Sequence, residues 1–356
     1  PRSWPSTPMS AEPMRAAAMP SLRRLGLVVA LVATGAAHAH HSALIFDRSR
    51  VVAFEGTVTH FGWANPHVYI HVATSDETGA TVEWELETDA TPILTRSGWS
   101  RDSLAPGDTV LVRANPDSNA DRRHALLVSI TKEDGQVLAA RSYFLRRDGD
   151  ATKGPGATSL AGVWELRYSD YTGFYSIWDT VALTARGSAS RDSYDVRSDS
   201  PEAQCIAMPT PGVIVAPYLN EIVLGEDRVL IRNERYNLER VVYTDGRGHP
   251  DDVAPTNQGH SIGWWEDGVL VVDTIAFEPH RSPILGKGVA SGLRKHVVER
   301  YALSEDGTQI TIEFVLEDPE YLAEPFAGSV VWHHAPHFEM LGFDCDLENS
   351  SRYTRE

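Results

Sequence analysis

The amino-acid sequence predicts a mainly β protein built from two barrels. Short segments in which apolar and polar residues alternate recur along the 356-residue chain, and Gly-containing turns separate many of them. A polar stretch at 146–159 contains Gly and Pro but no apolar period, so it indicates a linker. These observations predict a five-stranded OB-like barrel at 40–145 and a closed antiparallel barrel at 160–356.

Residues 40–145 are expected to hold five strands and one helix. The segment 81–87 has Val82, Trp84 and Leu86 on one face, as in a half-buried strand. Pro92 is favourable at the start of a helix, and Gly98 can end it. Three strands, a helix and two further strands follow the order of an OB-type barrel. The expected strands are 51–60, 67–73, 81–87, 109–113 and 124–130.

Residues 160–356 are expected to form repeated antiparallel hairpins, which fit a closed barrel or a sandwich. The strand expected at 309–316 is the most regular, because every second residue is apolar. Small and polar residues at 184–191 are compatible with a helix. The other expected strands are one that starts at Gly162, followed by 219–224, 228–233, 238–243, both arms of a hairpin within 257–277, 296–303, 330–332 and 338–343.

The first 39 residues have the pattern of a secretory signal peptide. Arg23 and Arg24 precede an apolar run at 25–35, which is too short to span a bilayer as a stable helix. The small residues Ala37 and Ala39 then form a small-x-small cleavage pattern. We therefore expect a periplasmic or secreted protein that does not insert into the membrane once the signal is cleaved.

The mature chain is strongly acidic. Four of the 32 basic residues and one of the 49 acidic residues fall within the first 39, which leaves 28 basic and 48 acidic residues and a net charge of −20. Such a surface repels nucleic acid and anionic membranes. The expected partner is therefore a small molecule and not a nucleic acid.

The sequence contains only two cysteines, Cys205 and Cys345. In an exported protein, two distant cysteines predict one disulfide. A zinc site is the weaker alternative, because no two cysteines stand close together in the Cys-x-x-Cys spacing.

A hairpin within 257–277 carries the main candidate site. Asp267-Gly268 is a strong signal for a two-residue turn, because the favoured turns need positive φ values that Gly tolerates. With a loop of even length, His260 and Asp273 point to the same side of the hairpin. Since Asp273 interrupts an apolar row that includes Val271 and Ile275, we expect the pair to lie on a mostly apolar wall inside the second barrel. A buried charge there needs a partner.

Further charged and aromatic residues on neighbouring strands are expected to join this site. His260 and Asp273 are the candidate base and its orienting group, and general acid–base catalysis favours such groups in a dry pocket. A structural network that only closes the barrel is an alternative interpretation of the same residues. The candidate ligand-binding residues are Glu234, Arg240, Tyr243, Trp265, Glu299 and Arg300.

A metal site is a second candidate, at the mature N-terminus. Cleavage after Ala39 frees the amine of His40, which can chelate Cu(II) together with its own imidazole, and His41 or His67 can add a nitrogen. A frayed terminus with unengaged histidines is the alternative. Three further histidines, within 333–337, are a third candidate, since three histidines in five residues resemble metal ligands. Pro336 excludes the i, i+3 geometry of a regular helix, and a solvated loop between strands is the favoured alternative.

Two resemblances add to this interpretation. The sequences His40-His-Ser42, Trp63-Ala-Asn-Pro-His67 and 103–108 resemble a family of small exported bacterial proteins without an established activity. Asp245-Gly-Arg-Gly-His-Pro250, Gly259-His-Ser-Ile-Gly263 and 270–274 resemble a second uncharacterised exported bacterial family. Both resemblances imply export, and the first implies a compact β fold.

Gly162-x-Trp164 at the head of the second group of strands is similar to the lipocalin and calycin signature. This resemblance implies a calycin-like barrel. It also implies that a late arginine such as Arg352 stacks on Trp164 and closes the base of the barrel.

The expected function is binding of a small, largely apolar molecule in the C-terminal barrel, with copper binding at the mature N-terminus as an additional role. A cofactor-free lyase, isomerase or hydrolase that uses His260 and Asp273 is the first alternative, and an interaction module without a pocket is the second. A serine hydrolase is not expected, because Ser261 leads into a strand instead of a helix.

Overall fold

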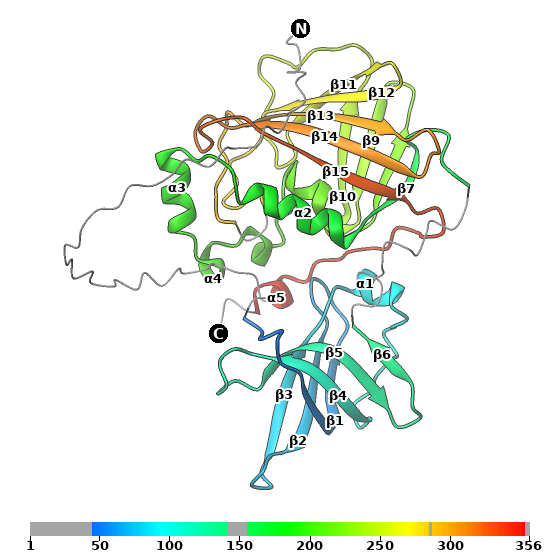
Figure 1. Cartoon of the computed structure of the whole chain (residues 1–356), viewed down its shortest axis with the longest axis vertical. Coiled ribbons are helices and arrows are strands. Elements are labelled where there is room, and N and C mark those ends of the chain that lie inside the picture. The colour runs from blue at the N-terminus through cyan, green and yellow to red at the C-terminus, as the bar shows by residue number, and fades with distance from the viewer. Residues whose placement is uncertain (1–44, 141–154, 285–286, 353–356) are drawn as a thin grey trace, which may run out of the picture. The chain divides into compact units, whose positions relative to one another are not determined.

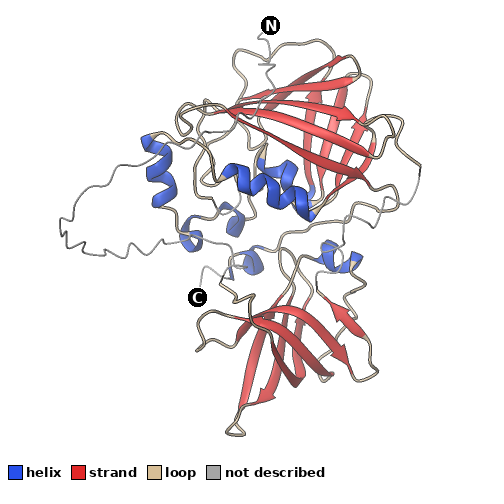
Figure 2. Cartoon of the chain, in the orientation of Figure 1, coloured by secondary structure: helices blue, strands red, loops and turns tan. Residues whose placement is uncertain are grey.

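A computed structural model describes residues 45–140, 155–284 and 287–352 of the chain, and these residues belong to one compact unit. Strands predominate, as Figure 2 shows, and they form two barrels. The predicted mainly β fold with two barrels is confirmed. The predicted signal peptide and most of the predicted linker lie outside the described residues. None of the helices in the described ranges has the length and apolar character needed to cross a membrane.

The first barrel has the strand order of an OB-type fold. Its sheet runs β3-β2-β1-β4-β5-β6, and a parallel pairing between β3 and β5 closes it. The helix α1 (Thr91–Arg96) stands between β3 and β4, where Pro92 occupies its first turn. The strands are β1 (Val52–Gly62), β2 (Tyr69–Ser75), β3 (Thr81–Glu87), β4 (Thr109–Pro116), β5 (His124–Lys132) and β6 (Val137–Ala139). Only the short β6 was not predicted.

The second barrel closes with nine strands in the order β10-β11-β12-β13-β14-β15-β7-β8-β9 (Figure 1). The strands are β7 (Gly162–Leu166), β8 (Asn220–Leu224), β9 (Arg228–Asn233), β10 (Leu238–Tyr243), β11 (His260–Glu266), β12 (Val269–Ile275), β13 (His296–Leu303), β14 (Gln309–Glu317) and β15 (Phe326–His334). The expectation that all pairs are antiparallel is wrong at one place, because β10 and β11 run parallel. The long connection at 244–259 makes this crossover geometrically feasible.

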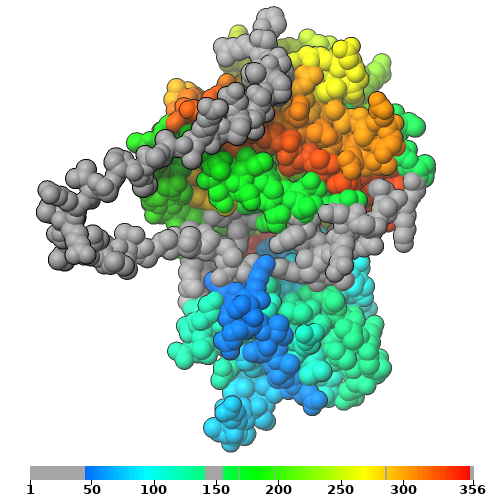
Figure 3. Space-filling model, in the orientation of Figure 1, coloured from blue at the N-terminus to red at the C-terminus, as the bar shows by residue number. Residues whose placement is uncertain are grey.

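Helices and short turns cover the second barrel on one side. Helix α2 packs against β15 (Figure 3) and buries Phe174 and Trp178 in the core, so these aromatic residues are core residues. The helices are α2 (Tyr168–Trp178), α3 (Ala185–Asp192), α4 (Val196–Asp199) and α5 (Leu347–Ser350), with short 3-10 turns η2 (Pro201–Gln204), η3 (Gly212–Val215) and η4 (Arg235–Asn237). The helix predicted at 184–191 therefore corresponds to α3.

The segment 338–343 is not a strand, contrary to the sequence prediction. Its apolar residues pack without a strand neighbour, and Phe343 is buried against Tyr218. The side chain of Asn237 replaces the missing backbone partner: its Oδ1 accepts from the Phe343 N–H at 2.8 Å, and its Nδ2 donates to the Phe343 carbonyl at 3.1 Å. The recurring apolar residues at 338–343 therefore reflect the packing of an irregular segment and not a strand.

The predicted hairpin is present, with its turn at Asp267 and Gly268. Both residues have positive φ, at 48° and 84°, as a two-residue turn of the favoured hand requires. The turn sets the register, which pairs His260 with Ile275 and Ile262 with Asp273.

Cys205 and Cys345 form the predicted disulfide, and no free cysteine occurs among the described residues. The bond links positions 140 residues apart, so it constrains a long loop of the unfolded chain. We expect the double variant C205S/C345S to lose about 2–4 kcal/mol of unfolding free energy. Urea denaturation of the oxidised protein and of the variant measures this loss. Coincident unfolding curves would show that the bond does not stabilise the fold.

Candidate functional site

His260 and Asp273 lie on the same side of the hairpin, as predicted, but that side is the outer face of the barrel. The neighbouring residues Leu270, Val272 and Thr274 point inward and are fully buried. Asp273 alternates with them and is therefore directed outward. The prediction of an interior pocket around His260 and Asp273 is wrong, because the apolar run of β12 is buried on both faces.

A third residue, His249, lies between His260 and Asp273. It comes from the connection 244–259, which crosses from β10 to β11. Its Nδ1 is 2.8 Å from Nδ1 of His260, so one of these nitrogens donates and the other accepts. Its Nε2 is 3.5 Å from Oδ1 of Asp273. Residues from three separate motifs of the sequence therefore meet at one point.

The chain of contacts continues on the other side of Asp273. His296, at the start of β13, places its Nε2 2.8 Å from Oδ1 of Asp273. Its Nδ1 is 3.4 Å from Oε2 of Glu317 on β14. We refer to His260, His249, Asp273 and His296 as the histidine relay.

The contacts within the histidine relay shift the pKa values of its members in different directions. Burial alone would raise the pKa of Asp273, but its hydrogen bond with His296 and the nearby imidazoles outweigh burial and lower it. The same hydrogen bond raises the pKa of His296. Partial burial, followed by the charges of His249 and Arg247, lowers the pKa of His260. At neutral pH the relay therefore joins a carboxylate to a neutral imidazole at its outer end.

Arg240 and Glu299 do meet inside the barrel, but away from the relay. Nη1 of Arg240 donates to Oε2 of Glu299 at 2.6 Å and to Oγ1 of Thr210 at 2.6 Å. Nη2 of Arg240 donates to the hydroxyl of Tyr301 at 3.0 Å, and that hydroxyl donates to Oε1 of Glu299 at 2.7 Å. Every polar group of this cluster has a partner, so it closes the barrel as a structural network.

Sequence analysis missed Lys295, which lies inside the same barrel. Its side chain is 1 % exposed, and its Nζ has no hydrogen-bond partner among the described residues. Burial lowers the pKa of Lys295 to about 7, although the carboxylates of Asp318 and Glu299 act in the opposite direction. Lys295, Val297, Glu299 and Tyr301 follow one another at every second position, so extension of the inward row of β13 would have found it.

The remaining candidate residues are dispersed. Glu234 is buried, forms an ion pair with Arg96 of α1 and accepts from the Leu341 N–H at 2.7 Å. Arg300 points outward and donates to Glu266 at 2.7 Å. Trp265 is 47 % exposed near the hairpin turn. Among these residues, only Tyr243 joins the relay, with its ring stacked on His260 at a centroid distance of 5.4 Å.

Ser261, next to His260, points inward. It is buried, and its hydroxyl is 2.8 Å from Oγ1 of Thr274 on the paired strand. This position within a strand supports the expectation that Ser261 is not a hydrolase nucleophile.

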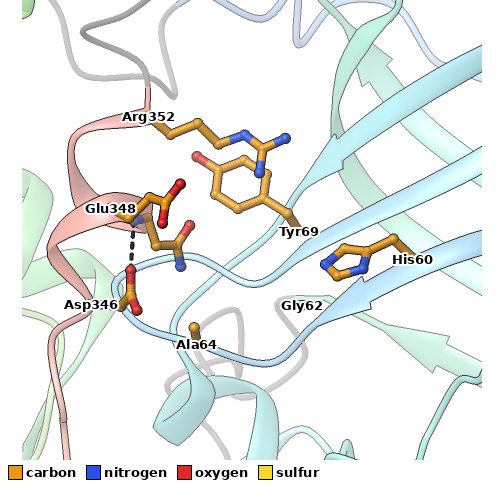
Figure 4. A pocket seen from close by; sticks show the side chains of 8 residues that line it. His60, Gly62, Ala64, Tyr69, Asp346, Glu348 and Arg352 are labelled. Atoms are coloured by element: carbon orange, nitrogen blue, oxygen red, sulfur yellow. Dashed lines mark hydrogen bonds between the residues drawn. The ribbon is translucent and has the colours of Figure 1, made fainter.

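A separate cavity of about 490 Å³ lies beside the first barrel (Figure 4). Arg352 lies over the ring of Tyr69, 4.7 Å from its centroid, and forms an ion pair with Glu85. The expected stacking of Arg352 on Trp164 is therefore wrong. The residues that line the cavity are His60, Gly62, Ala64, Tyr69, Asp346, Glu348, Asn349 and Arg352.

The base of the second barrel is closed by other contacts. Trp164 is fully buried, donates from Nε1 to the Leu160 carbonyl at 3.0 Å, and has the ring of His334 at 4.9 Å. His333 and His334 are buried residues of β15, so the predicted solvated loop is wrong for both. Because Pro336 stands after the end of the strand, it does not interrupt it.

Of the predicted copper ligands, only His67 lies within the described residues. Its Nδ1 is 3.0 Å from the Thr88 carbonyl, which leaves Nε2 for another partner. His40 and His41 fall outside the described ranges. Across the described ranges, no group of three or more His, Cys, Asp or Glu side chains is arranged to hold a metal ion.

Comparison with known families gives a match for part of the chain. Residues 28–126 match a family of unknown function, DUF6152. This match covers most of the OB-type barrel and agrees with the resemblance of that region to an uncharacterised family. No curated protein and no solved structure matches the chain.

Proposed function

We propose that the protein is an exported, cofactor-free enzyme that transfers a proton on a small molecule, with His260 as the base. The observation that carries this proposal is the position of His249, which lies 2.8 Å from His260 and within ion-pair distance, 3.5 Å, of the carboxylate of Asp273. A base works best when its unprotonated form is populated at the working pH and a second group fixes its orientation. The lyase, isomerase and hydrolase classes all use such a base.

The electrostatics of the relay support this role. His260 is only partly buried, so a substrate can reach it, and its lowered pKa keeps it unprotonated at neutral pH. A proton on Nε2 of His249 faces the Asp273 carboxylate, which leaves Nδ1 of His249 to accept from Nδ1 of His260 and directs the lone pair of His260 to its Nε2. His296 hydrogen-bonds to Asp273 and fixes its orientation. Asp273 is therefore a positioning residue, because it acts on His260 only through His249.

Replacement of His260 by Ala should reduce turnover by at least about 100-fold, because general base catalysis typically contributes that much or more. The purified mature protein is incubated with a small-molecule extract of its own compartment, and mass spectrometry follows which compounds are consumed. The matched control is H337A, which removes an exposed histidine outside the relay.

The variant D273N tests the positioning role of Asp273 with a readout that does not depend on activity. Without the carboxylate, the pKa of His296 falls, which NMR titration detects independently of activity. Consumption of the same compounds at the same rate by wild type, H260A and D273N would overturn the proposed function.

A second candidate function is binding of a small, largely apolar molecule inside the C-terminal barrel. It is favoured by the unpartnered amine of Lys295 beside an apolar cavity whose walls include Ile284 and Leu316. The free space is about 10 Å³, room for roughly one water molecule, so a ligand can enter only if the lining side chains move apart. Copper binding at the mature N-terminus stays a prediction of the sequence.

A further inference from the structure

The cavity beside the first barrel has walls from two distant parts of the sequence. One wall consists of His60 and Gly62 at the end of β1, Ala64 in the following loop and Tyr69 at the start of β2. The other wall is α5 with the residues that flank it, up to Arg352 (Figure 4). The volume of about 490 Å³ is within the range of roughly 300–1,000 Å³ that is typical of small-molecule pockets. The cavity therefore has room for a molecule and is separate from the histidine relay.

Hydrogen bonds hold α5 against the first barrel. The backbone N–H of Asp346 donates to the Asn65 carbonyl at 3.0 Å, and Nδ2 of Asn349 donates to the His67 carbonyl at 2.7 Å. The disulfide fixes Cys345, the residue before Asp346. Because both walls are held in place, the cavity is already formed before a ligand arrives, and binding requires little reorganisation.

Acidic side chains dominate the charge around the cavity. Asp346 and Glu348 contribute two carboxylates from the α5 side (Figure 4). Arg352, the arginine of the lining, forms an ion pair with Glu85, and its guanidinium lies over the ring of Tyr69. Three carboxylates are thus grouped with one guanidinium. This balance attracts a positively charged ligand and repels an anion.

The rest of the lining suits a ligand with a short apolar body. Gly62 and Ala64 present no polar side-chain group to the cavity, and the ring of Tyr69 is buried in its wall. His60 lies on the side opposite α5 (Figure 4). An ammonium group at the end of a carbon chain combines a positive charge with three hydrogen-bond donors for carboxylates and with an apolar body.

We propose that this cavity binds a small aliphatic amine in its ammonium form, with the nitrogen at Asp346 and Glu348. The binding is non-covalent and uses no residue of the histidine relay. H260A, which lacks the proposed base, should therefore bind the amine as wild type does. The amine site and the proton-transfer function can then fail independently.

Calorimetric titration of the mature protein tests the proposal with putrescine, butanediol and succinate, whose carbon chains are equally long and whose charges differ. We expect putrescine to bind at least about 10-fold more tightly than butanediol, and succinate to give no binding. The variant D346N/E348Q removes both charges and should weaken putrescine binding about 10-fold. Asparagine is also a favourable N-cap, so α5 is retained, and urea denaturation checks that the variant is folded. The matched control is E324Q, which changes an exposed glutamate outside the cavity.

The outcomes separate a specific site from general attraction to an acidic surface. Equal affinities for putrescine and butanediol would show that charge is not recognised and would overturn the proposal. Equal weakening by D346N/E348Q and E324Q would assign the binding to the overall charge and would overturn it as well. NMR gives the location: the imidazole signals of His60 should shift with putrescine in wild type. Binding that leaves these signals unchanged would place the amine elsewhere and contradict the assigned cavity.

Discussion

Replacement of Glu299 by Leu should lower the free energy of unfolding by about 3–5 kcal/mol, because it removes one partner of a buried ion pair. Arg240 is 4 % exposed and would keep its charge without a carboxylate. Burial acts to lower the pKa of Arg240, but the Glu299 carboxylate outweighs burial and raises this pKa above its ordinary value. An arginine side chain keeps its proton in proteins, so the guanidinium stays charged in the variant and lacks a compensating carboxylate.

Two further variants make this measurement specific. The double variant R240M/E299L removes both charges and should recover most of the loss, since apolar pairs often replace buried ion pairs without cost. R300M changes the next residue of β13, whose side chain is on the outer face in a partly exposed pair with Glu266, and should cost no more than about 1 kcal/mol. Urea denaturation of all variants gives the free energies. An E299L loss no larger than that of R300M would contradict the structural role of the network.

The strands of both barrels could be predicted because most of them bury one face only. In β14 the inward residues from Ile310 to Leu316 are almost fully buried, and the residues between them are more exposed. Such alternation fixes the period and the limits of a strand. Where a segment packs as an irregular chain, as Phe343 does, apolar residues also recur but hydrogen bonds come from a distant side chain, Asn237. Alternation cannot distinguish the two cases.

The candidate site was only partly predictable for a related reason. The turn at Asp267 and Gly268 fixed the pairing, so the sequence predicted correctly that His260 and Asp273 share a face. It did not identify which face is the interior, because Leu270, Val271 and Val272 are all buried. The linking residue, His249, comes from a connection without periodicity, and only the three-dimensional structure brings it between the other two.

The interior polar residues illustrate the same limit. Arg240 and Glu299 were expected in a functional site with Tyr243 and Arg300, which are their near neighbours in sequence. Arg240 and Glu299 point inward, whereas Tyr243 and Arg300 point outward, so adjacent residues of one strand serve different purposes. Lys295 lies one residue before β13. The strand predicted at 296–303 starts after it, so the sequence analysis did not count Lys295 among the inward residues.

The stability of wild type relative to K295M should increase by about 2–3 kcal/mol between pH 7.5 and 9.5. Burial lowers the pKa of Lys295 from 10.5 to about 7. Below pH 7 the folded and unfolded chains both carry the proton, and the folded chain bears the full cost of a buried charge. Between pH 7 and 10.5 only the unfolded chain binds it, so each rise in pH favours the folded chain.

The comparison with K295M isolates Lys295, because histidines and carboxylates that titrate near neutral pH contribute equally to both proteins. Methionine has a similar length and no ionisable group, so the variant should also be the more stable protein at pH 7.5. Urea denaturation at a series of pH values gives both free energies, and K287M, which removes a lysine paired with Asp179 near the surface, is the matched control. Parallel pH profiles for wild type and K295M would mean that the amine stays protonated in the folded barrel.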